Sequence, residues 1–166
     1  MAPVPGKGLR TPMLASGPAA AGCAELLRPL GASVTVLDGD AGEAATRKLL
    51  RSVFFKGMAA AVTEALHAAR EAGLEDWLRD NIGAELAAAD ASLVRRLEEG
   101  SVKHAVRRSA EMRAAARLLA ELGVPSRISD ASRRWLDQLA SSTESSTINA
   151  GTVRSERGKG KGDGTG

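Results

Sequence analysis

Hydrophobic and polar positions alternate along most of the chain at helical intervals. The longest such segment, residues 43–72, contains no proline and a single glycine, Gly57. Its apolar residues fall on two neighbouring rows: Ala45, Leu49, Val53 and Ala60, and Leu50, Phe54, Ala61 and Ala65. A stripe of this width and length is typical of the central helix of a bundle. Further helices are predicted at residues 74–86, 89–98, 102–122 and 130–140, with breaks at Gly73, Gly100 and Gly123-Val124-Pro125.

The amino-terminal part has a different pattern. Residues 33–37 alternate and carry β-branched side chains, which predicts a strand, and residues 9–16 form a second, weaker extended segment. A helix is predicted between them over residues 19–30, starting after Ser16-Gly17-Pro18. Strand, helix and strand in this order form an α/β crossover, but two strands alone do not make a stable sheet. The sequence therefore predicts a small part of a larger parallel sheet.

Composition agrees with a mainly helical protein. The 166 residues are 43% hydrophobic but only 2% aromatic, so the core has to be built from Ala, Leu and Val. Residues 151–166 hold four basic and two acidic residues, which leaves only +1 of the net +3 charge for the rest of the chain. Because the other charges are interleaved, we expect no nucleic-acid partner.

The sequence lacks the patterns of disulfide-bonded, metal-binding, membrane-spanning and secreted proteins. The single Cys23 allows no intramolecular disulfide, and one cysteine with two distant histidines does not make a metal site. No segment approaches the roughly 18 apolar residues of a membrane span, and the start lacks the pattern of a secretory signal. We therefore expect a cytoplasmic protein without a metal and without a membrane partner.

The candidate chemistry lies where the second strand gives way to the long helix. Lys48 falls on the second turn of this helix, and Arg51 and Ser52 follow at plus three and plus four. An amine with a pKa near 10.4 is a poor base unless burial or nearby cations such as Arg47 and Arg51 lower the pKa. The alternative interpretation is a solvated lysine on a long helix.

These residues also carry a family resemblance. Residues 2–7, Ala-Pro-Val-Pro-Gly-Lys, and the spacing Gly42-x-Ala44-x-x-x-Lys48 resemble the D-A-P-V-S-G-G and G-x-G-x-x-x-K-x-x-N-N motifs of 3-hydroxyacid dehydrogenases, relatives of 6-phosphogluconate dehydrogenase. The run H-x-x-R-R-x-x-E-M from His104 and the following Gly123-Val124-Pro125 resemble the branch with an uncharacterised phosphogluconate-dehydrogenase-like carboxy-terminal domain. The resemblance covers roughly residues 2–140.

The resemblance implies a fold and a domain division. It implies a carboxy-terminal helical bundle of the 6-phosphogluconate dehydrogenase type with a long central helix, after a remnant of a Rossmann-type α/β domain. Residues 1–40 would be that remnant, from about two strands and one helix, and residues 41–140 the helical domain. The polar residues 141–166 would form a disordered tail. On this interpretation the chain is truncated at its amino end relative to such an enzyme.

The resemblance also implies site residues. Lys48 matches the catalytic lysine, which exchanges a proton with the substrate hydroxyl, and Gly6, Arg51 and Ser52 match substrate-binding positions. The family's paired asparagines are replaced by Arg51 and Ser52, and a later Lys-Asp pair aligns with Ala110-Glu111, so the amine of that pair is absent. An arginine here would favour a carboxylate or phosphate on the substrate.

The complete enzyme would use NAD or NADP. The G-x-G-x-x-G fingerprint that grips the cofactor does not occur in this chain, so cofactor-binding residues stay unknown and the chain alone is expected to bind neither cofactor. The predicted function is the substrate-binding and dimerisation part of an NAD(P)-dependent oxidoreductase acting on a hydroxy acid or related alcohol, inactive by itself. A homodimer, a separate cofactor-binding half and a small-molecule substrate are the predicted partners. The alternative is a non-catalytic helical assembly or binding module.

Overall fold

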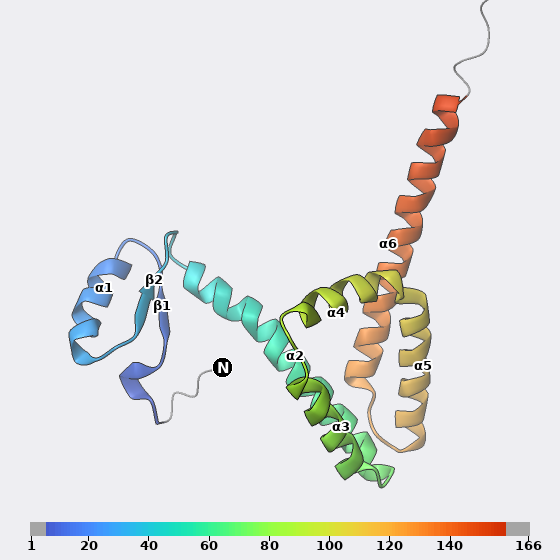
Figure 1. The fold of residues 1–166 in the computed structure, drawn as a ribbon, viewed down its shortest axis with the longest axis horizontal. Coiled ribbons are helices and arrows are strands. Elements are labelled where there is room, and N and C mark those ends of the chain that lie inside the picture. Colours follow the sequence, from blue (N-terminus) through green and yellow to red (C-terminus); the bar gives the residue numbers. More distant parts are fainter. Residues whose placement is uncertain (1–5, 159–166) are drawn as a thin grey trace, which may run out of the picture. The chain divides into compact units, whose positions relative to one another are not determined.

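The structure is a computed structural model that describes the backbone of residues 6–158 and the side chains of residues 6–142 (Figure 1). This part of the chain is mainly helical, with six α-helices and a two-stranded parallel sheet near the amino end. The predicted fold class is therefore confirmed. The chain divides into two compact units, Met1–Ala60 and Ala61–Gly166, and the boundary falls inside the long helix. The predicted domain boundaries at residues 40 and 140 stay predictions.

The first unit contains a small α/β element. Strand β1 (Met13–Ala15) pairs in parallel with β2 (Val34–Val36), in the register Met13↔Val34 and Ala15↔Val36. Helix α1 (Ala20–Leu27) and a short 3₁₀ helix (Arg28–Leu30) connect them, and another 3₁₀ turn (Gly8–Arg10) precedes β1. The apolar cluster consists of buried Ala24, Ala32 and Val34, with Met13, Ala15, Leu27 and Val36 packed against it. Strand, helix and strand thus follow the predicted order.

Helix α2 (Glu43–Glu71) begins at the carboxyl edge of this sheet. The Ser16 hydroxyl, just after β1, accepts a hydrogen bond from the Ala44 backbone N–H at 3.0 Å. The Gly17 N–H donates to the Gly39 carbonyl at 3.2 Å, and a β-carbon on Gly17 would lie 3.0 Å from the Ala41 α-carbon. These contacts fix the start of α2 beside the ends of both strands, where parallel sheets hold their ligands.

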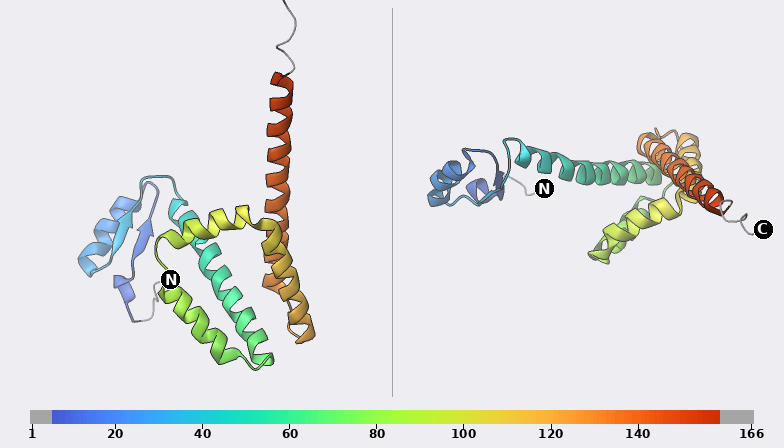
Figure 2. Two further views of the ribbon diagram at one scale, coloured as in Figure 1. Left: turned by 45° about the vertical axis from the view of Figure 1, so that its right-hand side comes forward. Right: turned by 90° about the horizontal axis from the view of Figure 1, so that it is seen from above.

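The second unit consists of helices. The carboxyl part of α2 is followed by α3 (Glu75–Ala87), α4 (Ser92–Lys103), α5 (Ala105–Glu121) and α6 (Arg127–Gly158). Figure 2 shows α5 alongside the first part of α6, and these two helices share the most extensive packing. Buried Ala68, Leu119 and Val124 form the apolar cluster, which joins α2 to the end of α5.

Helices α4 and α6 continue well beyond their predicted ends at residues 98 and 140. Helix α4 continues through Gly100 to Lys103, so the predicted break at Gly100 is wrong. Gly100 makes room for a neighbouring side chain instead of ending the helix. A β-carbon at this position would lie 2.9 Å from a guanidinium nitrogen of Arg108. Helix α6 passes residue 140 and continues to Gly158. Residues 141–150 contain neither glycine nor proline, so the local backbone permits the continuation. The end of the predicted tail, residues 159–166, lies outside the described residues.

Among the described helices, none is both long enough and apolar enough to cross a bilayer.

Candidate functional site

The first candidate site is a row of polar residues on the amino-terminal half of α2. Lys48, Arg51 and Ser52 are separated by three and four residues, so they share one face of the helix. Lys48 and Arg51 are exposed and Ser52 is half-buried. Because α2 starts at the carboxyl edge of the sheet, this row lies in the first turns beyond that edge. We call Lys48, Arg51 and Ser52 the α2 row.

The guanidinium group of Arg51 has an aromatic partner that the sequence did not reveal. Its central carbon lies 4.3 Å from the centre of the Phe55 ring, in a cation–π contact. Phe54 meets Phe55 edge to face at 5.1 Å between ring centres. The spacing of one helical turn between Arg51 and Phe55 was the available signal. Within the described part of the chain, no acidic residue forms an ion pair with Arg51 or Lys48.

Gly6 and Arg47, which the sequence analysis also singled out, have the following surroundings. Gly6 has φ of +87°, and a β-carbon placed on it would meet no atom within 4 Å, so this face of Gly6 points into open space. Arg47, one of the two cations expected to act on the Lys48 amine, forms an ion pair with Glu43 at 2.8 Å. Lys48 itself is exposed.

The β1–α1 turn occupies the position at which a Rossmann-type domain binds its dinucleotide. Such a site needs free backbone N–H groups converging at the start of the helix after the strand. Here the Gly17 N–H already donates to the Gly39 carbonyl, Pro18 has no N–H, and the Ser16 hydroxyl serves the start of α2. The residues of this turn therefore do not fit the pyrophosphate of NAD or NADP.

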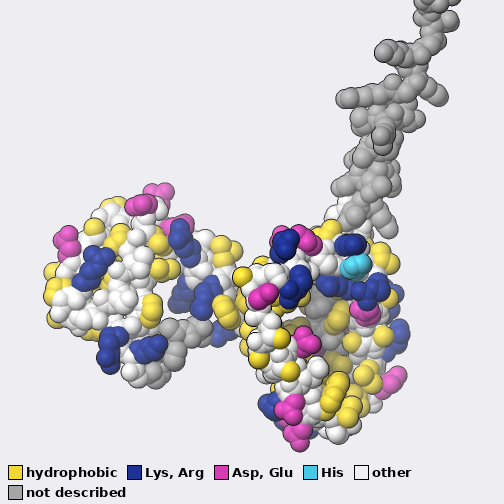
Figure 3. Space-filling model, in the orientation of Figure 1, with side chains coloured by type: hydrophobic (Ala, Val, Ile, Leu, Met, Phe, Trp, Pro, Cys, Tyr) yellow, Lys and Arg dark blue, Asp and Glu magenta, His cyan; other side chains and the backbone are white. Residues whose placement is uncertain are grey.

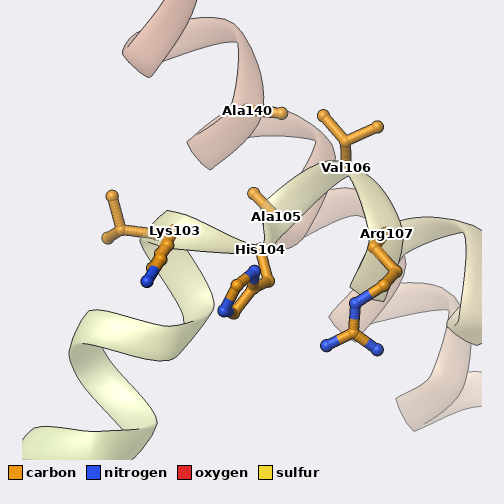
Figure 4. Close-up of a pocket in the computed structure, with 7 residues that line it drawn as sticks. Lys103, His104, Ala105, Val106, Arg107 and Ala140 are labelled. Atoms are coloured by element: carbon orange, nitrogen blue, oxygen red, sulfur yellow. The ribbon is translucent and has the colours of Figure 1, made fainter.

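A second candidate site lies where α4 meets α5. A cavity of about 400 Å³ is lined here by Val102, Lys103, His104, Ala105, Val106, Arg107 and Ala140. His104 ends α4 and immediately precedes α5. Figure 4 shows the side chains of Lys103, His104 and Arg107 extending to the same side of this junction, with Ala105, Val106 and Ala140 on the other side. We call Lys103, His104 and Arg107 the junction cluster.

The motif H-x-x-R-R-x-x-E-M is partly explained by contacts within the helices. Arg107 forms an ion pair with Glu111 one turn later. Arg108 instead turns back to α4, where its guanidinium donates to the Ser101 hydroxyl at 2.8 Å. His104 makes no side-chain contact of this kind within the described residues. Arg108 therefore connects α5 to α4, the ion pair of Arg107 lies within α5, and His104 stays free to contact a ligand.

Two further polar clusters are structural. The Glu64 carboxylate on α2 accepts hydrogen bonds from the backbone N–H groups of Ile128 and Ser129, at 2.7 and 2.8 Å, and from the Ser129 hydroxyl at 2.7 Å. Partial burial raises the pKa of Glu64, but these hydrogen bonds outweigh it and lower the pKa overall. On α6, the hydrogen bond from the buried Ser109 hydroxyl lowers the pKa of Asp137, against a smaller effect of burial. No group of side chains in the described part of the chain could hold a metal ion.

Part of the chain is similar to a described protein family. Residues 69–139 match the family model described as a domain of unknown function, DUF1932. They include the end of α2, helices α3, α4 and α5 and the first part of α6, so the part of the chain that resembles DUF1932 is helical. The junction cluster lies inside it, whereas the α2 row precedes it.

One solved structure is also similar in sequence. It is a conserved hypothetical protein from Sinorhizobium meliloti 1021, with 30% identity and a TM-score of 0.42, and the match covers 82% of this chain and 46% of that chain. The chain thus spans somewhat less than half the length of that protein. No curated protein matches the chain.

Proposed function

We propose that the chain is the substrate-binding and assembly part of an NAD(P)-dependent oxidoreductase of the 3-hydroxyacid dehydrogenase type. The observation that carries the proposal is the position of the α2 row. A primary amine, a guanidinium group and a hydroxyl share one helix face directly beyond the carboxyl edge of a parallel sheet. Ligands of α/β proteins bind at this edge.

The three groups of the α2 row have complementary chemistry. Oxidation of an alcohol requires a base that takes the hydroxyl proton, and the Lys48 amine would fill this role. The Arg51 guanidinium, held against the Phe55 ring, would pair with the substrate carboxylate, and the Ser52 hydroxyl would donate a further hydrogen bond. A hydroxy acid offers both functional groups, which makes it the favoured class of substrate.

The cofactor belongs to another part of the assembly. The β1–α1 turn does not fit a dinucleotide, so we assign no cofactor contact to the described residues. Calorimetric titration of the 166-residue chain with NAD and NADP should therefore show no binding tighter than about 100 µM, a free energy of roughly 5.5 kcal/mol.

A second candidate function, a non-catalytic assembly module, has its own support. Leu49, Leu50 and Val53 on α2 are 66%, 67% and 74% exposed. Apolar side chains exposed in a group usually mark an interaction surface. The same surface would serve the dimer of a complete enzyme, so catalysis by the α2 row distinguishes the two functions.

The test combines the chain with a dinucleotide-binding domain of the 3-hydroxyacid dehydrogenase type, supplied as a second chain. A panel of 3-hydroxy acids is added with NAD or NADP, and formation of the reduced cofactor is followed by absorbance. We expect turnover only when both chains are present. Amide NMR of the chain with the same acids should show shifts around Lys48, Arg51 and Ser52. Absence of both turnover and these shifts would favour the assembly module.

A further inference from the structure

The junction cluster in the second unit is not used by the proposed dehydrogenase function. Lys103, His104 and Arg107 line one cavity and extend to the same side of the α4–α5 junction (Figure 4). In the space-filling view, Lys and Arg side chains gather beside a histidine in this region (Figure 3). Three nitrogen-bearing side chains thus lie within five consecutive residues, at the junction between two helices.

Their charges are only partly compensated within the described residues. Arg107 is paired with Glu111, while Lys103 and His104 have no ion pair there. The side chains of Arg107 and Glu111 are 63% and 56% exposed. A ligand oxyanion can therefore compete with Glu111 for the guanidinium group. The first turn of α5 contains no acidic residue, so the helix dipole adds to the positive charge of the cluster.

We propose that the junction cluster binds the phosphate group of a small molecule. A phosphate monoester carries close to two negative charges and three terminal oxygens. It can therefore accept hydrogen bonds from an ammonium, an imidazole and a guanidinium group at once, whereas a carboxylate offers two oxygens and one charge. The cavity of about 400 Å³ leaves room for such a group and for part of the molecule that carries it.

A small molecule fits this site better than a nucleic acid. The lining of the cavity contains no Phe, Tyr or Trp on which a base could stack. Beyond the cluster, basic and acidic residues are interleaved, as in Arg95-Arg96-Leu97-Glu98-Glu99, so the described residues offer no continuous basic track for a phosphate backbone. The inference does not depend on Lys48 or on a dehydrogenase reaction.

The experiment is an amide NMR titration of the 166-residue chain with inorganic phosphate, glycerol phosphate and acetate, at constant ionic strength. We expect saturable shifts for residues 102–107 with both phosphates, with a dissociation constant below about 5 mM, and binding of acetate at least about 5-fold weaker. Lys103→Gln and His104→Gln should each weaken phosphate binding about 5-fold or more. Arg117→Gln, at an exposed arginine further along α5, is the matched control and should leave the affinity unchanged.

Other outcomes would overturn the proposal. They include shifts that do not saturate, equal affinity for acetate and phosphate, and equal loss in the Arg117→Gln variant. Tighter, strongly salt-dependent binding of a single-stranded oligonucleotide with shifts spread over several helices would indicate a nucleic-acid surface instead. Because no assay of turnover is involved, failure here leaves the proposed dehydrogenase function untouched, and failure of that function leaves this site untouched.

Discussion

At the scale of single residues, Glu64 forms the described side-chain hydrogen bonds that join the residues farthest apart in the sequence of the helical unit. Its carboxylate receives three hydrogen bonds from the first residues of α6, about 65 positions later in the chain. The backbone N–H groups at the start of a helix have no partner within the helix, so an acceptor supplied from elsewhere stabilises that helix end. Glu64 therefore fixes the start of α6 against α2.

Replacing this carboxylate should destabilise the fold. Glu64→Gln keeps the size of the side chain but leaves one N–H or hydroxyl donor without its charged acceptor. We expect the free energy of unfolding at neutral pH, measured by urea denaturation, to fall by about 1–3 kcal/mol. Glu121→Gln, at an exposed glutamate of α5, should change it by less than about 0.5 kcal/mol. Equal effects of the two substitutions would rule out the capping role.

The lowered pKa of Glu64 adds a pH signature. Because its pKa is lower in the folded chain than the ordinary value of 4.5, this carboxylate stabilises the fold above pH 4.5. The stabilisation is lost as the pH falls through the folded-state pKa. The difference in unfolding free energy between the natural chain and Glu64→Gln should therefore shrink on acidification from pH 6 toward about pH 3. A difference that stays constant over this range would contradict the assignment.

At the scale of elements, the sequence predicts local structure better than contacts between elements. Alternation in residues 33–37 identified β2, and the apolar rows identified α2, because both patterns are set by local backbone geometry. The role of Gly100 was missed because it depends on Arg108 folding back from the next helix. The shared helix face of Lys48, Arg51 and Ser52 follows from their spacing, whereas the stacking of Arg51 on Phe55 and the capping of α6 by Glu64 depend on side-chain positions in space.

The connection between the sheet and α2 depends on Gly17. Its φ of +96° is unfavourable for other residues, and an added β-carbon would lie 3.0 Å from the Ala41 backbone. Gly17→Ala should therefore destabilise the first unit by about 1–3 kcal/mol, measured by hydrogen exchange of the β1 and β2 amides.

Gly22 provides the matched control for Gly17. It lies inside α1, and a β-carbon on it would meet no atom within 4 Å. Gly22→Ala should therefore stabilise the helix by about 0.5–1 kcal/mol. Equal exchange rates in the two variants would show that the contact between Gly17 and Ala41 does not hold the start of α2.

At the scale of the whole molecule, the described residues leave many large apolar side chains exposed. No large side chain among them is fully buried, and α2 exposes Leu49, Leu50, Val53 and Phe54 to more than half of their area. Burial of apolar surface stabilises folded chains and complexes at roughly 25 cal/mol per Å². A second copy that covers these residues would therefore stabilise the chain considerably.

We expect the chain to form a dimer at micromolar concentration in sedimentation equilibrium. Val53→Glu would place a charge in the apolar row of α2 and should weaken the dimer at least about 10-fold. Leu26→Glu, at a leucine of α1 that is 76% exposed, should leave the dimer intact. A stable monomer of the natural chain at tens of micromolar, or equal effects of both substitutions, would contradict assembly through α2.

We propose that Lys48 exchanges a proton with the substrate, and kcat of the chain assembled with a cofactor-binding part tests this role most directly. Lys48→Ala should lower kcat by about 100-fold or more with cofactor affinity nearly unchanged, because general acid–base groups contribute about 10²- to 10⁴-fold. Lys56→Ala, two helical turns further along α2, should keep near-normal kcat. If Lys48→Ala kept most of the activity, or if both variants lost it equally, the α2 row would not be a catalytic site.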